Sequence, residues 1–70
     1  MLVVTQERER RGWSRAELAR RAQMSSGEVG KIEAGRLIPY DSQRRKLARA
    51  LGIPVDTLLE AATPTADDAA

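Results

Sequence analysis

The sequence predicts an all-α domain, a compact bundle of five short helices, and two observations support this prediction. Ser14 and Ser25 are each followed three positions later by a Glu, Glu17 and Glu28, which is the pattern of a helix start. The Ser side chain accepts a bond from a free backbone N–H, and the Glu side chain accepts one from the backbone N–H of the Ser. Apolar residues after each Ser recur at helical spacing. We therefore expect two short helices joined by a tight turn at about residues 22–24.

The other helices are predicted from the same periodicity and from glycines that can end a helix. The first helix should occupy about residues 2–11 and the fourth about residues 41–51, each followed by a glycine. A short fifth helix should open with Pro54 in its first turn and extend to Glu60.

Length and composition fit one small domain at residues 1–61, followed by a disordered tail at 62–70 whose residues cannot bury enough surface to become ordered. The chain has no Cys and no His, so we expect no enzyme, no metal site and no cofactor. The apolar start of the chain is too short for a signal peptide, and no apolar run is long enough to span a membrane. A soluble intracellular protein is expected.

The charge of the chain is divided unevenly. Residues 1–55 hold all 12 Lys and Arg and six of the 10 acids, a net charge of +6, and the other four acids follow. A basic domain with an acidic end fits a polyanionic partner such as nucleic acid. A helical domain with solvated arginines would carry the same charges, so charge alone does not separate these two interpretations.

A helix, a short turn and a second helix that crosses the first can place one exposed helix in the major groove of DNA. An ordered set of residues accompanies this pattern: Arg8, Gly12-Trp13-Ser14, Glu17-Leu18-Ala19, Val29, Ile32-Glu33-Ala34-Gly35-Arg36, Pro39 and Leu47-Ala48-Arg49-Ala50-Leu51-Gly52-Ile53. With this set the chain resembles the phage-repressor-like helix-turn-helix family, the Cro/C1 or xenobiotic-response-element (XRE) type, over about residues 2–60. Four positions depart from the family pattern. Gln23 stands where the family has the turn Gly, Glu7 replaces an apolar residue of the first helix, and Gly27 and Gly30 fall inside the helix that should read DNA.

The resemblance implies a lambda-repressor-like fold and a cytoplasmic, prokaryotic or phage-encoded transcriptional regulator. We expect a repressor that binds a two-fold symmetric operator in double-stranded DNA as a homodimer, through the helix at about 25–34. Pairing two half-sites multiplies the discrimination of a domain that touches few base pairs. Val55, Leu58 and Leu59 are the expected dimer interface, because a short terminal helix cannot bury all its apolar residues.

Base-edge contacts are expected from four residues of that helix: Ser26, Gly27, Glu28 and Lys31. Lys31 can donate to guanine, Ser26 can donate or accept, and Glu28 could accept from cytosine. Capping of Ser25 is the competing role of Glu28. Gly27 and Gly30 each cost the helix roughly 1 kcal/mol relative to Ala. Either they let the backbone approach the groove floor, or the fold simply tolerates them.

Phosphate contacts are expected from five residues around the helix: Arg15, Arg36, Tyr40, Ser42 and Arg44. Arg15 matches the position that clamps the backbone of one DNA strand in the family, and Arg36, in the loop after Gly35, is the natural partner for the other side. The other three lie at a positive helix N-terminus. The other basic residues outside the first helix are interpreted as a solvated face: Arg20, Arg21, Arg45, Lys46 and Arg49.

Arg8 and Glu33 have a structural role in the resembled family, as a largely buried ion pair that ties the first helix to the third. Breaking such a pair leaves a buried charge unpaired, at a cost of about 3–5 kcal/mol. Trp13 is expected to pack into the core, with stacking on a base as the alternative.

Two other functions remain open at this point. An antitoxin-like or anchoring protein-interaction module would use the same fold to bind another protein and would contact DNA weakly. The helix poor in side chains and Glu28 both favour it. A nucleic-acid binder without sequence preference is favoured by the same glycines.

Overall fold

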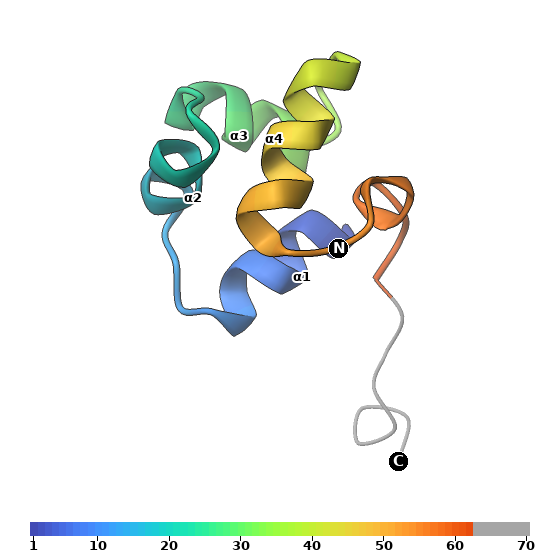
Figure 1. Cartoon of the computed structure of the whole chain (residues 1–70), viewed down its shortest axis with the longest axis horizontal. Coiled ribbons are helices and arrows are strands. Elements are labelled where there is room, and N and C mark those ends of the chain that lie inside the picture. The colour runs from blue at the N-terminus through green and yellow to red at the C-terminus, as the bar shows by residue number, and fades with distance from the viewer. Residues whose placement is uncertain (63–70) are drawn as a thin grey trace.

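Four α-helices and one 3₁₀ turn form the fold in the computed structural model, which describes residues 1–62. The elements are α1 (Val3–Arg10), α2 (Arg15–Ala22), α3 (Ser26–Glu33), α4 (Asp41–Leu51) and η1 (Val55–Thr57). In Figure 1, α2 lies to the left of α4, α3 passes behind α4, and α1 runs below it. Within residues 1–62 there is no named strand and no helix long and apolar enough to cross a membrane. The tail expected at 62–70 lies outside the described residues from Thr63 onward.

The two predicted helix starts differ in how completely they are capped. At α3 both bonds form: Ser25 Oγ accepts from the Glu28 N–H at 3.1 Å, and Glu28 Oε1 accepts from the Ser25 N–H at 3.1 Å. At α2 Ser14 Oγ accepts from the Glu17 N–H at 3.0 Å, but the Glu17 carboxylate pairs with arginines further along the helix instead. Each helix therefore begins where the sequence predicts.

The turn between α2 and α3 has a left-handed residue that is not glycine. Gln23 follows the last residue of α2 with φ 58° and ψ 47°. Left-handed backbone brings Cβ close to the following carbonyl oxygen, and glycine alone avoids this contact. The replacement of the family's turn glycine by Gln23 therefore leaves strain in the turn.

The expected fifth helix is reduced to the single 3₁₀ turn of η1, and the residues after this turn bond to the start of α1. After the single turn of η1, the Leu58 carbonyl oxygen accepts from the Val4 N–H at 3.0 Å, and the Glu60 carbonyl oxygen accepts from the Val3 N–H at 2.9 Å. The first N–H groups of a helix have no partner within it, and α1 has no side-chain cap. The chain after η1 supplies partners for two of them. Ala62 extends this pairing by donating to the Met1 carbonyl oxygen at 2.8 Å.

Every helix contributes to one apolar core. Its buried members are Val4, Leu18, Ala19, Ala22, Val29, Ile32, Leu47, Leu51 and Leu58. These include the apolar residues predicted on one face of α2 and of α3. Trp13 packs against the core and remains half-buried, with the guanidinium of Arg21 4.2 Å from the ring centroid and that of Arg11 at 5.6 Å. Arg11 also donates to the Leu51 carbonyl oxygen at the end of α4, so this side chain joins the end of α1 to α4.

Candidate nucleic-acid interface

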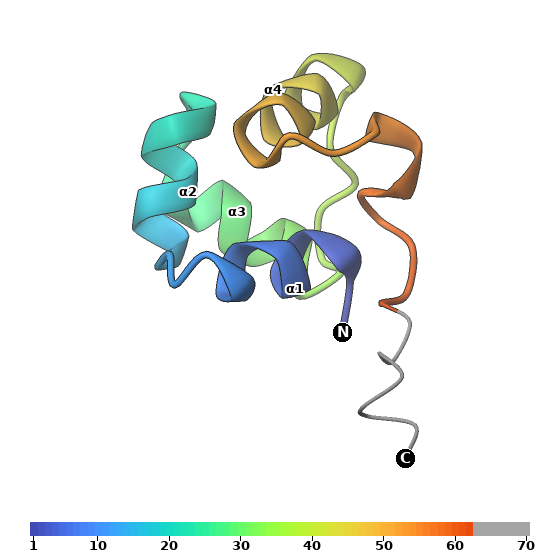
Figure 2. The same ribbon diagram turned by 60° about the horizontal axis from the view of Figure 1, so that its bottom comes forward.

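One face of α3 is buried and the opposite face is open. Val29 and Ile32 lie in the core, and Ser26, Gly27 and Lys31 are exposed on the surface of the same helix. Figure 2 shows α3 beside α2 and behind α1, with α4 above α1 and α3. A single helix held by its neighbours along one face can present the other face to a groove in DNA.

The two glycines of α3 are not required by the fold. A Cβ at Gly27 would lie 3.9 Å from Ser25 Oγ, and one at Gly30 would lie 3.7 Å from Arg15 Cδ, which are ordinary contact distances. Neither glycine has a positive φ. Alanine fits at both positions, so the steric demands of this domain do not explain the glycines.

Glu28 has a partner for each of its carboxylate oxygens. Oε1 accepts from the Ser25 N–H, and Oε2 accepts from Gln43 Nε2 at 2.8 Å. The hydrogen bonds of Ser25 lower the pKa of Glu28, and the charge of Lys46 lowers it further. Glu28 thus joins the start of α3 to α4.

The sequence did not lead us to expect a role for Gln43, which bonds to Glu28. Gln43 Oε1 also accepts from the Tyr40 N–H at 2.9 Å, so it caps α4 while it bonds to Glu28. The signal was present in the sequence, because Gln at the third position of a helix is the reciprocal half of a capping box.

The residues expected at phosphates lie around α3, and two of them are paired with acids. Tyr40 is 76% exposed, and Arg36 and Ser42 are exposed as well. Arg44 is half-buried and pairs with Asp41 of its own helix, which lowers the pKa of Asp41. Arg15, the other paired residue, bonds to a carboxylate of α3.

That carboxylate belongs to Glu33, which also forms the ion pair expected with Arg8. Arg8 Nε donates to Glu33 Oε2 at 2.7 Å, and Arg8 Nη2 donates to Glu33 Oε1 at 3.1 Å. Arg8 Nη1 donates to the Trp13 carbonyl oxygen at 2.7 Å. The Glu33 side chain is 2% exposed, and its hydrogen bonds raise the pKa of Arg8. The pair therefore links α1, the chain before α2, and α3.

A family model described as a helix-turn-helix domain matches residues 3–62, nearly the whole described chain. The chain belongs to the helix-turn-helix family of the Cro/C1, XRE type. No curated protein matches it. The family assignment and the fold agree, since α2, the turn at Gln23 and α3 are the helix-turn-helix element.

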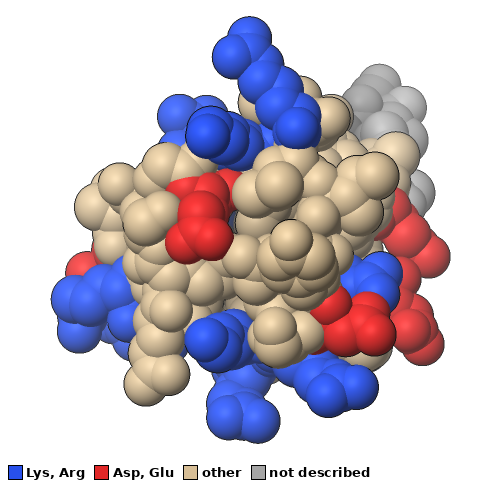
Figure 3. Space-filling view, turned by 90° about the horizontal axis from the view of Figure 1, so that it is seen from above, with Lys and Arg blue, Asp and Glu red and all other residues tan. Residues whose placement is uncertain are grey.

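Charges on the helix-turn-helix domain are not spread evenly. Figure 3 views the end of the domain where α4 begins, and there Lys and Arg side chains stand around much of the edge, while acidic side chains lie along the right edge and in a separate patch left of the middle. Clustered Lys and Arg side chains of this kind attract polyanions.

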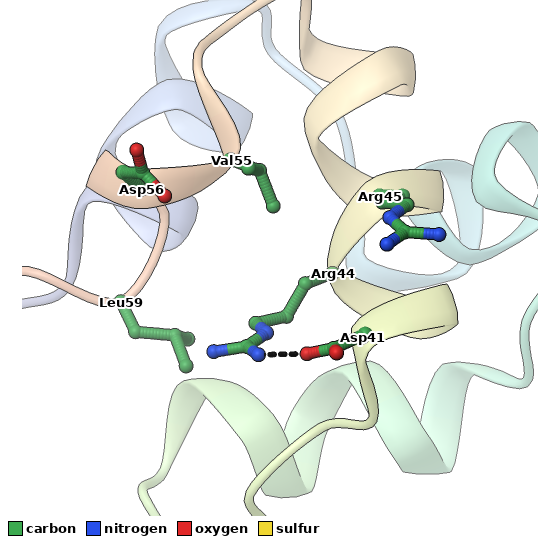
Figure 4. A pocket seen from close by; sticks show the side chains of 6 residues that line it. All are labelled: Asp41, Arg44, Arg45, Val55, Asp56 and Leu59. Atoms are coloured by element: carbon green, nitrogen blue, oxygen red, sulfur yellow. Dashed lines mark hydrogen bonds and ion pairs between the residues drawn. The ribbon is translucent and has the colours of Figure 1, made fainter.

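Two shallow grooves lie beside α4. The first, of about 310 Å³, is lined by Asp41, Arg44, Arg45, Val55, Asp56 and Leu59 (Figure 4). The second, of about 350 Å³, is lined by Arg21, Ala22, Gln23, Lys46, Arg49 and Ala50. Two of the three residues expected at a dimer interface thus line one groove.

The expectation that Leu58 lies at the dimer interface is wrong. Leu58 is 0% exposed, and Val55 is 38% exposed. A side chain with no accessible surface in the folded subunit has none to bury against a second one. Leu58 is part of the core because the chain after η1 turns back onto α1.

Proposed function

We propose that this helix-turn-helix domain is a sequence-specific transcriptional regulator, a repressor that binds a two-fold symmetric operator as a homodimer. The observation that carries the proposal is the open face of α3, with Ser26 and Lys31 exposed between flanking cations. A regulator of this kind acts where its DNA is, in the cytoplasm of a bacterium.

Base reading is assigned to Lys31 and Ser26, with the backbone at Gly27 close to the floor of the groove. Lys31 can donate to guanine O6 and N7, and Ser26 can donate or accept at a base edge. Glu28 takes a different role in the proposal, as a brace between α3 and α4, because both its oxygens already accept hydrogen bonds. Reading a cytosine would require one of these bonds to break.

Phosphate binding is assigned to Arg15 and Arg36 on either side of α3, and to Tyr40 and Ser42 at the start of α4. The exposure of these side chains supports the assignment. The free N–H groups at the start of α4 add partial positive charge there. Arg44 is a weaker member of the set, since it pairs with Asp41 and would exchange that partner for a phosphate.

The dimer contact is assigned to the groove beside η1, where Val55 and Leu59 offer apolar surface next to Arg45 and Asp56. In a two-fold contact the same patch appears on both subunits. A patch that carries both signs of charge can pair with itself, because each acid can face a base of the other copy.

The deciding experiment is a gel-shift titration with the DNA that flanks the domain's own gene, at two salt concentrations, against a random duplex of equal length. We expect preference for the flanking DNA and a steep loss of affinity with salt. A wild-type domain with no preference for any DNA at moderate salt would favour the protein-interaction module instead. Two observations favour that module. Both carboxylate oxygens of Glu28 already accept hydrogen bonds within the domain, and two glycines leave α3 with few side chains for reading bases.

A further inference from the structure

The carboxylate of Glu33 serves two arginines that lie in different environments. Its Oε1 accepts from Arg8 Nη2 at 3.1 Å and from Arg15 Nε at 3.2 Å, while Oε2 accepts from Arg8 Nε at 2.7 Å. The Arg8 side chain is buried, whereas that of Arg15 is 58% exposed. A buried acid of α3 therefore holds an exposed arginine at the start of α2.

The bond to Glu33 leaves the binding end of Arg15 available. A guanidinium has five N–H donors, and within residues 1–62 the Arg15 side chain uses only the one on Nε. Its stem passes over α3, since a Cβ at Gly30 would lie 3.7 Å from Arg15 Cδ. Because the guanidinium is planar, fixing Nε also fixes the direction of the two terminal nitrogens.

Charge supports the same arrangement. The single negative charge of Glu33 is already matched by Arg8, so the three groups together carry a net charge of +1. Arg15 can therefore bond to Glu33 and still attract an anion. A side chain held in place before binding also loses less freedom on binding than a mobile one.

We infer that Glu33 is a positioning residue for DNA binding, which holds Arg15 with both terminal nitrogens directed at a backbone phosphate. This inference rests on the proposed function, since it takes Arg15 as a phosphate contact. It gives Glu33 a second role beside the structural pair with Arg8.

A double-mutant cycle tests the inference. The affinity of a random duplex at low salt is measured for the wild type, Arg15→Ala, Glu33→Gln and the double variant, at a temperature where circular dichroism shows every chain folded. We expect Arg15→Ala to weaken binding by about tenfold in the wild type. In the Glu33→Gln background the same change should cost less than about threefold. An equal factor in both backgrounds would overturn the inference.

Arg36→Ala is the matched control for this cycle. Arg36 is exposed and has no ion pair among the described residues. Its removal should weaken binding by the same factor with Glu33 or Gln at position 33. Should Arg36→Ala also lose its effect in the Glu33→Gln background, the variant would have damaged the whole surface, and a specific role for Arg15 would be refuted.

Arg15→Lys provides a second test if Glu33→Gln does not fold. Lysine keeps the charge, but it lacks both the Nε–H that bonds to Glu33 and the planar pair of terminal nitrogens that would face the phosphate. We expect Arg15→Lys to weaken binding nearly as much as Arg15→Ala, whereas Arg36→Lys should weaken it clearly less than Arg36→Ala, because a contact made by charge alone tolerates lysine. Wild-type affinity in Arg15→Lys would show that charge alone matters at position 15.

Nuclear magnetic resonance of the arginine Nε–H groups separates this inference from the proposed function. In the free protein the Arg15 Nε–H should exchange with water more slowly than that of Arg36. A slow signal in a protein that binds no duplex would overturn the DNA-binding function and leave the ion pair intact. An Arg15 signal as fast as that of Arg36 in a protein that does bind DNA would overturn the positioning role alone.

Discussion

The Val4 N–H donates to the Leu58 carbonyl oxygen at 3.0 Å, and the side chains of both residues lie wholly within the core. The residues are 54 positions apart in the chain, and their contact closes the domain. The start of α1 is thus satisfied by the segment that follows η1, and the stability of the domain depends on that segment.

Leu58→Ala should therefore lower the free energy of unfolding by about 2–5 kcal/mol, because it leaves a cavity in a small core. Removal of the chain from Thr63 onward should leave the melting temperature nearly unchanged. Circular dichroism followed during urea denaturation measures the free energy of unfolding, and followed during heating it measures the melting temperature. A Leu58→Ala chain as stable as the wild type would show that Leu58 is not in the core.

Gly27→Ala and Gly30→Ala should each raise the free energy of unfolding by about 0.5–1 kcal/mol, because alanine is the better helix former and fits at both sites. DNA affinity of the same variants separates the two interpretations of the glycines. Weaker binding by a more stable variant would mean that the backbone of α3 approaches the DNA closely. Unchanged binding would mean that the fold only tolerates the glycines. A loss of stability would contradict the contact distances at these positions.

Lys31→Ala should cost about 1–3 kcal/mol of binding free energy on the preferred DNA and much less on a random duplex, because a base contact depends on sequence. Arg36→Ala is the comparison, since a phosphate contact should weaken both DNAs by a similar factor and lower the salt slope by about one ion. Titrations of each variant against both DNAs at two salt concentrations measure this. If Lys31→Ala weakens the two DNAs equally, Lys31 contacts a phosphate and sequence reading comes from elsewhere, such as DNA shape.

Leu59→Glu should weaken the homodimer, because it places a charge in the apolar part of the groove beside η1. Sedimentation velocity at tens of micromolar protein measures the change. Ile38→Glu is the matched control, since Ile38 is an exposed apolar residue outside that groove. A wild type that is strictly monomeric at this concentration would rule out the proposed interface.

Stability should fall in acid. The pKa is lowered by hydrogen bonds in the folded state for four carboxylates: Glu7, Glu17, Glu28 and Asp41. A lowered pKa stabilises the fold above the ordinary value, 4.5 for Glu, and this stabilisation is lost as the pH falls through the folded-state pKa. Urea midpoints should therefore be steady near neutral pH and decline below about pH 4.5.

Glu28→Gln should make that acid decline shallower, because Gln cannot take up the proton that the unfolded chain binds. Glu60→Gln is the control, an exposed carboxylate in the segment after η1. An identical pH profile for the wild type and Glu28→Gln would show that the cap at Ser25 does not depend on the charge of Glu28.

Features decided within one helical turn could be predicted from the sequence alone. The starts of α2 and α3 follow from Ser14 and Ser25, whose hydroxyls bond to an N–H only three residues away. The end of α4 follows in the same way, since Gly52 takes the left-handed conformation that stops the helix. These bonds do not depend on what surrounds the helix. The family could likewise be recognised from the order of residues along the chain.

The family resemblance implied one distant contact, the pair of Arg8 and Glu33, and the tertiary structure alone decided the others. It reduced the expected fifth helix to one 3₁₀ turn, and it brought the carbonyl groups after η1 to the first N–H groups of α1, which have no partner within that helix. It placed Leu58 in the core, Gln43 against Glu28, and Arg15 on the acid that already paired with Arg8. Each of these contacts joins residues at least 15 positions apart. They exist only once the helices cross at particular angles and the side chains between them fill the core, and no local pattern in the sequence encodes that geometry.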